Sequence, residues 1–190
     1  MKTTVPKLTN LTPVTGRMIN EEDEIHNVVD NYGSLKTIDR AHSSVHDGVS
    51  WTYAGAGSVA AGQSIYFMGV TGDVTAHLWE FFVKTDSAPI TVEFYEGATT
   101  SNDGTPQTPL NRNRQGTFTP SMQVFAGPTV TSDGTQLILA KILGNQQTVS
   151  SDNLEGEWIL KKNTKYTFKI TNNSQQAANI AAGFNWLEID

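Results

Sequence analysis

The chain has 190 residues, a formal net charge of −6 and no cysteine. The acidic balance disfavours a nucleic-acid-binding surface, which needs clustered basic side chains. The lack of cysteine excludes disulfides, thiolate zinc sites and cysteine nucleophiles. No stretch approaches the ~20 consecutive apolar residues of a membrane-spanning helix. Neither nucleic acid nor a membrane is therefore expected as a partner.

Residues 1–40 differ from the rest of the chain and are predicted to form an N-terminal arm. Pro6 and Pro13 favour extended backbone, and this part of the sequence shows little periodicity. Within the arm, Asn20 and the acidic residues after it are typical of a helix start, and the apolar residues that follow have helical spacing. A short helix is therefore expected over residues 21–30.

Residues 41–190 are predicted to form one β-domain. Short runs in which apolar and polar residues alternate are typical of strands, and turn signals such as Asp-Gly separate these runs. The predicted strands cover residues 45–53, 64–70, 74–84, 90–96, 121–131, 135–143, 157–160, 164–171 and 178–189. No helical pattern lies between them, which argues against a parallel sheet. The expected fold is an all-β antiparallel β-sandwich, most simply a jelly roll, although strand count does not separate this from an up-and-down sandwich.

The residue types that carry catalysis or bind metals do not form a recognisable motif. His42 and His46 lie in a segment predicted as strand or turn, where a separation of four residues spans ~13 Å. His77 lies within a strand. Glu93 and Glu96 are predicted on opposite faces of one strand, which does not suit a glycosidase pair. No enzyme activity and no cofactor are predicted, with a metal-dependent enzyme of the cupin type as an alternative on the same kind of fold.

Two further features have both a structural and a functional interpretation. Asp103 and Asp133 precede glycines in turns that resemble fragments of calcium loops, but neither segment has the full ligand spacing, so plain turns are predicted. Aromatic side chains on strands are usually part of the core, although one or two could stack on sugar rings. The tryptophans to which this applies are Trp51, Trp79, Trp158 and Trp186.

Two segments are candidate partner-binding sites. The long connection between residues 97 and 120 holds one dense run of basic and amide side chains, and a connection of this length is usually functional or disordered. Arginine and asparagine there could dock onto a partner or close a subunit interface, whereas the alternative is a solvated loop. An arm that orders on a partner must bury apolar side chains to offset a backbone entropy cost of ~1–2 kcal/mol per residue. The candidate residues are Asn111, Arg112, Asn113 and Arg114 in the connection and Leu8, Leu11, Val14 and Met18 in the arm.

Several short segments, taken in order along the chain, resemble a group of tailed-phage virion proteins that are encoded among head and tail genes. They are residues 45–48 (Val-His-Asp-Gly), 94–114 with its Tyr-Glu-Gly, Asp-Gly-Thr and Asn-Arg-Asn pieces, 128–130 (Pro-Thr-Val), 156–160 (Gly-Glu-Trp-Ile-Leu) and 166–174, which ends in Thr-Asn-Asn-Ser. The resemblance covers residues 42–190 and does not reach the N-terminal arm.

Proteins of this group are described as capsid decoration, or cement, proteins. The resemblance implies a β-sandwich of jelly-roll type that binds the major capsid protein on the outer surface of the phage head. It also implies self-association, as a homotrimer or homodimer, and no enzyme activity. The alternative function is a carbohydrate- or receptor-binding module of a phage tail or baseplate, which would use exposed aromatic and amide side chains.

Overall fold

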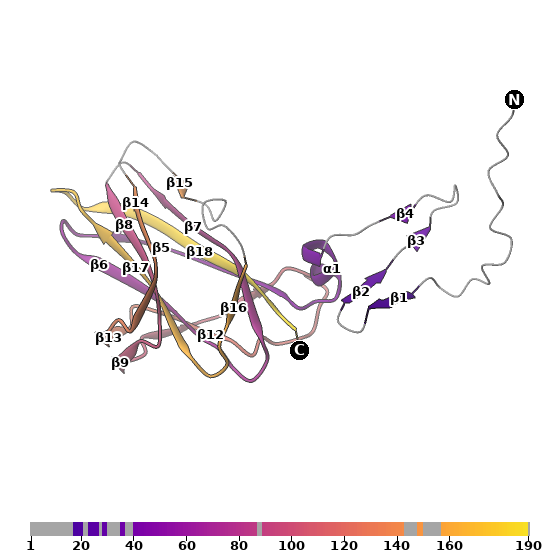
Figure 1. Ribbon diagram of the computed structural model, residues 1–190. Helices are drawn as coiled ribbons and strands as arrows, with labels where there is room; N and C mark the ends of the chain where they lie inside the picture. Colours follow the sequence, from indigo (N-terminus) through magenta and orange to yellow (C-terminus); the bar gives the residue numbers. More distant parts are fainter. Residues whose placement is uncertain are drawn as a thin grey trace, which may run out of the picture. The chain divides into compact units, whose positions relative to one another are not determined.

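The computed structural model describes residues 17–20, 23–26, 28–29, 35–36, 40–86, 89–142, 148–149 and 157–189. The chain divides into two units, Met1–Ser43 and Ser44–Asp190. The described residues of the second unit form a β-sandwich, which Figure 1 shows as two layers of long strands.

The described strands of the first unit pair as two antiparallel ribbons. These strands are β1 (Arg17–Asn20) with β2 (Asp23–His26), and β3 (Val28–Val29) with β4 (Leu35–Lys36). The helix expected over residues 21–30 is therefore wrong, since the described residues of that range are strands. Its apolar residues are β-branched, which lowers helix propensity and favours extended backbone. Of the predicted arm contacts, Met18 lies in β1, whereas Leu8, Leu11 and Val14 lie outside the described residues.

A short helix, α1 (Arg40–His46), precedes the first long strand. His42 and His46 lie on it, so the expectation that they belong to a strand or turn is wrong. Two residues after the helix end lies Gly48, whose φ of 74° is a left-handed conformation that glycine adopts without steric cost. Gly48 N donates to Val45 O at 3.1 Å and Val49 N donates to Ser44 O at 3.1 Å, which is the Schellman pattern of a helix end.

The sandwich consists of two antiparallel sheets, here named after their central strands. The β17 sheet has the order β10 (Thr105–Gln107), β12 (Gln123–Ala126), β6 (Ser64–Val70), β17 (Lys165–Asn172), β8 (Ile90–Glu96) and β14 (Thr135–Ile142). The β18 sheet has the order β11 (Leu110–Asn111), β5 (Ser50–Val59), β18 (Ala178–Glu188), β7 (Ala76–Thr85) and β15 (Thr148–Val149), with β16 (Trp158–Leu160) also paired to β7.

The pairing of the long strands is that of a jelly roll. The first long strand, β5, pairs with the last, β18, and the pairs β6–β17, β7–β16 and β8–β14 are nested inside it. Such nesting arises when one long antiparallel ribbon folds over to make two facing sheets, whereas an up-and-down sandwich pairs each strand with its sequence neighbour. The expected all-β antiparallel sandwich is confirmed, and the strand order selects the jelly roll.

The core is built around a stack of phenylalanine rings from both sheets. Phe168 of β17 lies 4.2 Å from Phe81 of β7, 4.5 Å from Phe94 of β8 and 5.2 Å from Phe184 of β18, measured between ring centroids. All four rings are at most 3% exposed. They occupy alternate strand positions that face the opposite sheet, as a period of two requires.

The connection from β8 to β14 adds a small ribbon that is absent from the simplest jelly roll. It pairs β9 (Thr99–Asn102) with β13 (Thr129–Ser132), so the strand predicted over 121–131 is divided between β12 and β13. Two lysines of β17 reach the two Asp-Gly turns beside this ribbon: Lys165 pairs with Asp103, and Lys169 Nζ lies 3.1 Å from Asp133 Oδ2. The aspartates that resembled calcium ligands therefore attach the ribbon to the outer face of the β17 sheet.

The Thr-Asn-Asn-Ser segment spans the end of β17 and the turn that follows, and the side chain of Asn172 forms most of its hydrogen bonds. This side chain is fully buried. Its Nδ2 donates to Val59 O at 2.9 Å and Gln176 O at 2.8 Å, while its Oδ1 accepts from Ser174 N at 2.9 Å and Ser174 Oγ at 2.7 Å. The segment thus joins the ends of β5 and β17.

We predict that Asn172→Ala lowers the free energy of unfolding by about 2–4 kcal/mol, because it leaves several buried backbone and hydroxyl groups without partners. The matched control is Asn173→Ala at the exposed neighbouring position, which should change stability by less than about 0.5–1 kcal/mol. Urea unfolding followed by tryptophan fluorescence measures both. Equal effects of the two variants would contradict the role assigned to Asn172.

The ribbon attachment should weaken in acid. Hydrogen bonds from Lys165 and then Thr100 lower the pKa of Asp103 in the folded protein. A lowered folded-state pKa means that the ionised carboxylate contributes stability above the pKa of the unfolded chain, ~3.9, and that this contribution is lost as the pH falls through the folded-state pKa. Asp103→Asn should therefore be less stable than the wild type at neutral pH, and the difference should shrink towards pH ~2. Urea unfolding across this range tests it, and a pH-independent difference would contradict it.

Candidate docking surface

Asn111 fixes the start of the loop that carries the predicted basic run. It is the last residue of β11, lies opposite Trp51 of β5 and is 8% exposed. Its Nδ2 donates to Gly48 O at 2.7 Å, and its Oδ1 accepts from Asn113 N at 2.8 Å. Arg112 N donates to Ser50 O at 2.9 Å. The loop is therefore attached to the turn that connects α1 with β5.

Asn113 repeats this arrangement two residues later. Its Nδ2 donates to His46 O at 3.0 Å, its Oδ1 accepts from Gln115 N at 3.1 Å, and its backbone oxygen accepts from Gly116 N at 2.9 Å. An asparagine side chain that bonds the backbone two residues on forms an Asx-turn, which holds a tight local conformation. Both predicted asparagines are thus used inside the molecule, where they position the loop.

Glu188 at the end of β18 binds the backbone just after the loop, at Ser121 and Met122. One carboxylate oxygen accepts from Ser121 N at 2.6 Å, and the other accepts from Met122 N at 2.8 Å and from the Trp186 indole at 3.0 Å. Glu188 and Trp186 are buried. Hydrogen bonds to a carboxylate are stronger than those between neutral groups. The exposed residues between Asn111 and Ser121 are therefore attached to the sandwich on both sides.

The two predicted arginines, in contrast, project from the loop. Arg112 and Arg114 are exposed, and neither guanidinium group forms an ion pair with another described residue. The hydrogen bond that Arg114 makes is a long one, from Nη1 to Asn111 O at 3.5 Å. The asparagine side chains are thus bonded within the protein, whereas the arginine side chains extend into solvent.

Sequence reasoning did not single out two apolar side chains in the same loop. Phe118 is 63% exposed and Leu110 is 52% exposed. The Phe118 ring lies against Gly48, only 3.1 Å from where a Cβ atom on that glycine would be. A larger residue than glycine would thus crowd the ring as well as strain the turn. We call residues 110–118 the Arg–Phe loop, with Arg112, Arg114, Leu110 and Phe118 as its exposed side chains.

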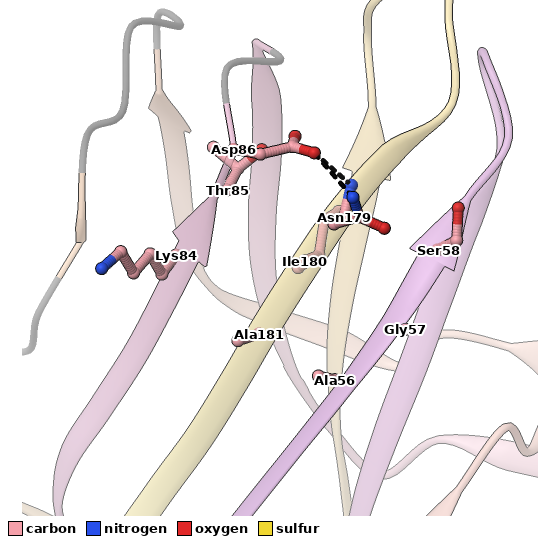
Figure 2. Close-up of a pocket in the computed structure, with 9 residues that line it drawn as sticks. All are labelled: Ala56, Gly57, Ser58, Lys84, Thr85, Asp86, Asn179, Ile180 and Ala181. Carbon is pink, nitrogen blue, oxygen red and sulfur yellow. Dashed lines mark hydrogen bonds between the residues drawn. The ribbon is translucent and has the colours of Figure 1, made fainter.

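An open pocket of about 470 Å³ lies at the ends of β5, β18 and β7 (Figure 2). Asp86 points toward Asn179, whose backbone N and Nδ2 donate to one Asp86 oxygen at 3.2 and 2.8 Å. Lys84 extends away from this pair. The lining residues are Ala56, Gly57, Ser58, Lys84, Thr85, Asp86, Asn179, Ile180 and Ala181, none of which is aromatic.

Other residues considered as ligands or stacking groups lie elsewhere. His77 Nδ1 is 3.0 Å from Glu157 Oε1. Trp51 and Trp186 are buried in the core, and Trp158 packs against it. Across the described part of the chain, no three His, Asp or Glu side chains are grouped so that they could hold a metal ion, and no helix is long and apolar enough to cross a membrane.

Comparison with known proteins gives a likeness in structure but none in sequence. No family model matches the chain, and no curated protein matches it in sequence. Among solved structures, the crystal structure of the Yersinia pseudotuberculosis-derived mitogen is similar over 73% of this chain and 86% of that chain, with 12% sequence identity and a TM-score of 0.33.

We predict that the Asn111 anchor keeps the loop resistant to trypsin. Asn111→Ala removes the bond to Gly48 and should raise the rate of cleavage after Arg112 and Arg114 by about tenfold, because cleavage follows the population of the locally open loop. The control is Gln115→Ala, since only the backbone of Gln115 is used in the loop. Mass spectrometry of timed digests gives both rates. Equal cleavage of the two variants would show that Asn111 does not hold the loop.

Proposed function

We propose that this chain is a structural protein of a tailed-phage virion. In this proposal it decorates the outer surface of the head, binds the major capsid protein and associates with itself as a homotrimer or homodimer. The observation that carries the proposal is the Arg–Phe loop, an exposed cationic and aromatic segment that hydrogen bonds of Asn111 and Asn113 hold in place. The resemblance of residues 42–190 to capsid decoration proteins supports the same function.

A loop of this kind suits protein docking for two physical reasons. Arginine and aromatic side chains are enriched where protein interfaces gain most of their binding energy. A loop that is already ordered also loses little conformational entropy on binding, so more of its contact energy appears as affinity. Several copies in one oligomer would strengthen attachment further without any additional contact in each subunit.

A second candidate, a carbohydrate- or receptor-binding module of the tail or baseplate, has the pocket of Figure 2 in its favour. Asp86, Asn179 and Ser58 supply acceptors and donors of the kind that bind hydroxyl groups. Titration with a panel of saccharides, with Asp86→Ala as the comparison, tests this candidate. Binding that the substitution abolishes would support it, and a panel without any binding would count against it.

The proposed function predicts specific attachment to heads. Purified heads of the phage that encodes the chain, prepared from a mutant lacking it, should bind the recombinant full-length protein to saturation, and immunogold labelling of complete virions should cover the head. Capsid-free tails serve as the control for co-sedimentation. Label confined to the tail, or the absence of head binding, would contradict decoration, and tail label would favour the second candidate.

A further inference from the structure

The Arg–Phe loop also indicates the chemistry of its partner. We infer that it docks into an apolar socket bordered by carboxylate side chains on the capsid surface. Phe118 would enter the socket, and Arg112 and Arg114 would bind the carboxylates. This inference rests on the proposed function, because it places the socket on the capsid.

The first argument concerns which polar groups of the loop remain available. The Asn111 and Asn113 side chains are bonded to the turn after α1 and to the loop backbone. The backbone N–H groups of Arg112, Asn113 and Gln115 also have partners within the protein. The two guanidinium groups therefore remain as the main donors of the loop, and their natural acceptor is a carboxylate, which arginine can bind through two parallel hydrogen bonds.

The second argument concerns charge. The chain carries 19 acidic and 13 basic side chains, so the loop is a cationic feature of an acidic molecule. Several basic residues elsewhere are paired, as Lys161 is with Glu96 and Lys169 with Asp133. Arg112 and Arg114 form no such pair with a described residue. Carboxylates on a partner would give these two arginines the ion pairs that the lysines already have within the protein.

The third argument concerns the apolar side chains. Phe118 exposes 63% of its surface although the rest of the loop is fixed. One edge of its ring lies next to Gly48, so the exposed ring is placed beside the turn to which Asn111 is bonded. Leu110 is also largely exposed at the start of the same loop. An aromatic anchor beside arginines is the usual composition of an interface hot spot, and it requires an apolar recess on the partner.

A protein partner fits these groups better than nucleic acid does. Arginine also binds phosphates, but affinity for nucleic acid comes from many neutralised phosphates, about 6–10 in a typical complex. The Arg–Phe loop offers two guanidinium groups on a chain with a net charge of −6, and long-range repulsion of a polyanion would oppose them.

The experiment measures binding of the full-length protein to chain-deficient heads for matched pairs of variants. Phe118→Ala is paired with Ile159→Ala, because Ile159 is an equally exposed side chain on β16, at 66%. Arg112→Glu with Arg114→Glu is paired with Lys162→Glu, an exposed cation between β16 and β17 that lies outside both the loop and the pocket. Circular dichroism and trypsin resistance show that each variant keeps its fold.

Phe118→Ala and the arginine reversal should each weaken head binding by at least about tenfold, and the two controls should change it by less than about threefold. Raising the salt from about 50 to about 500 mM should weaken wild-type binding and leave an Arg112→Ala, Arg114→Ala variant less affected.

If the wild type binds heads and all variants bind equally well, the inference is wrong while decoration stands. If the wild type does not bind heads, the proposed function fails and the inference fails with it. Tighter binding to single-stranded DNA than to heads, lost on arginine reversal, would overturn the protein partner in favour of nucleic acid.

Discussion

Phe168 determines how the two sheets of the sandwich fit together. Its ring stacks on Phe94 within its own sheet and on Phe81 and Phe184 of the facing sheet. Because side chains alternate between the faces of a strand, a shift of β17 by one residue would turn Phe168 outward and carry Lys165 and Lys169 into the core. The aromatic stack and the lysine–aspartate pairs on the opposite face therefore require the same register. The packing of Phe168 in the core therefore also fixes where the β9–β13 ribbon is attached on the outer face of the sheet.

The connection between β8 and β14 is then attached to this frame both near its ends and in its middle. On one side, β17 holds the β9–β13 ribbon through Asp103 and Asp133. On the other side, Asn111 and Asn113 bind the carbonyl groups of the turn that ends α1. Residues 112–122 of this connection contain no strand, and the polar side chains at their ends replace water at specific backbone groups. What remains outside these contacts is the exposed edge that bears the arginines and Phe118.

Much of the fold could be predicted from the sequence, because alternation is a local signal. Residues 64–70 and 90–96 are strands with the predicted bounds. The helix at Arg40–His46 was missed because seven residues give too short a window for helical periodicity, and its end depends on the backbone of Gly48. In the candidate site, the Asn–Arg run was recognised from composition. Composition does not show that the asparagines bond within the protein while the arginines stay exposed. That difference depends on contacts with residues some sixty positions away, such as the bond from Asn111 to Gly48.

The position of a cationic loop on an acidic chain has a consequence for docking. In the proposed docking, the net charge of −6 opposes approach to a partner surface that bears carboxylates in most orientations, whereas the orientation that presents Arg112 and Arg114 is favoured. Charge therefore selects the orientation before contact, and the fixed loop then needs little rearrangement to insert Phe118. A flexible loop with the same residues would gain the electrostatic attraction but would lose part of the contact energy in ordering. In the proposed docking, the bonded asparagines and the exposed arginines of one short segment thus act together, because the asparagines fix the geometry in which the arginines would bind.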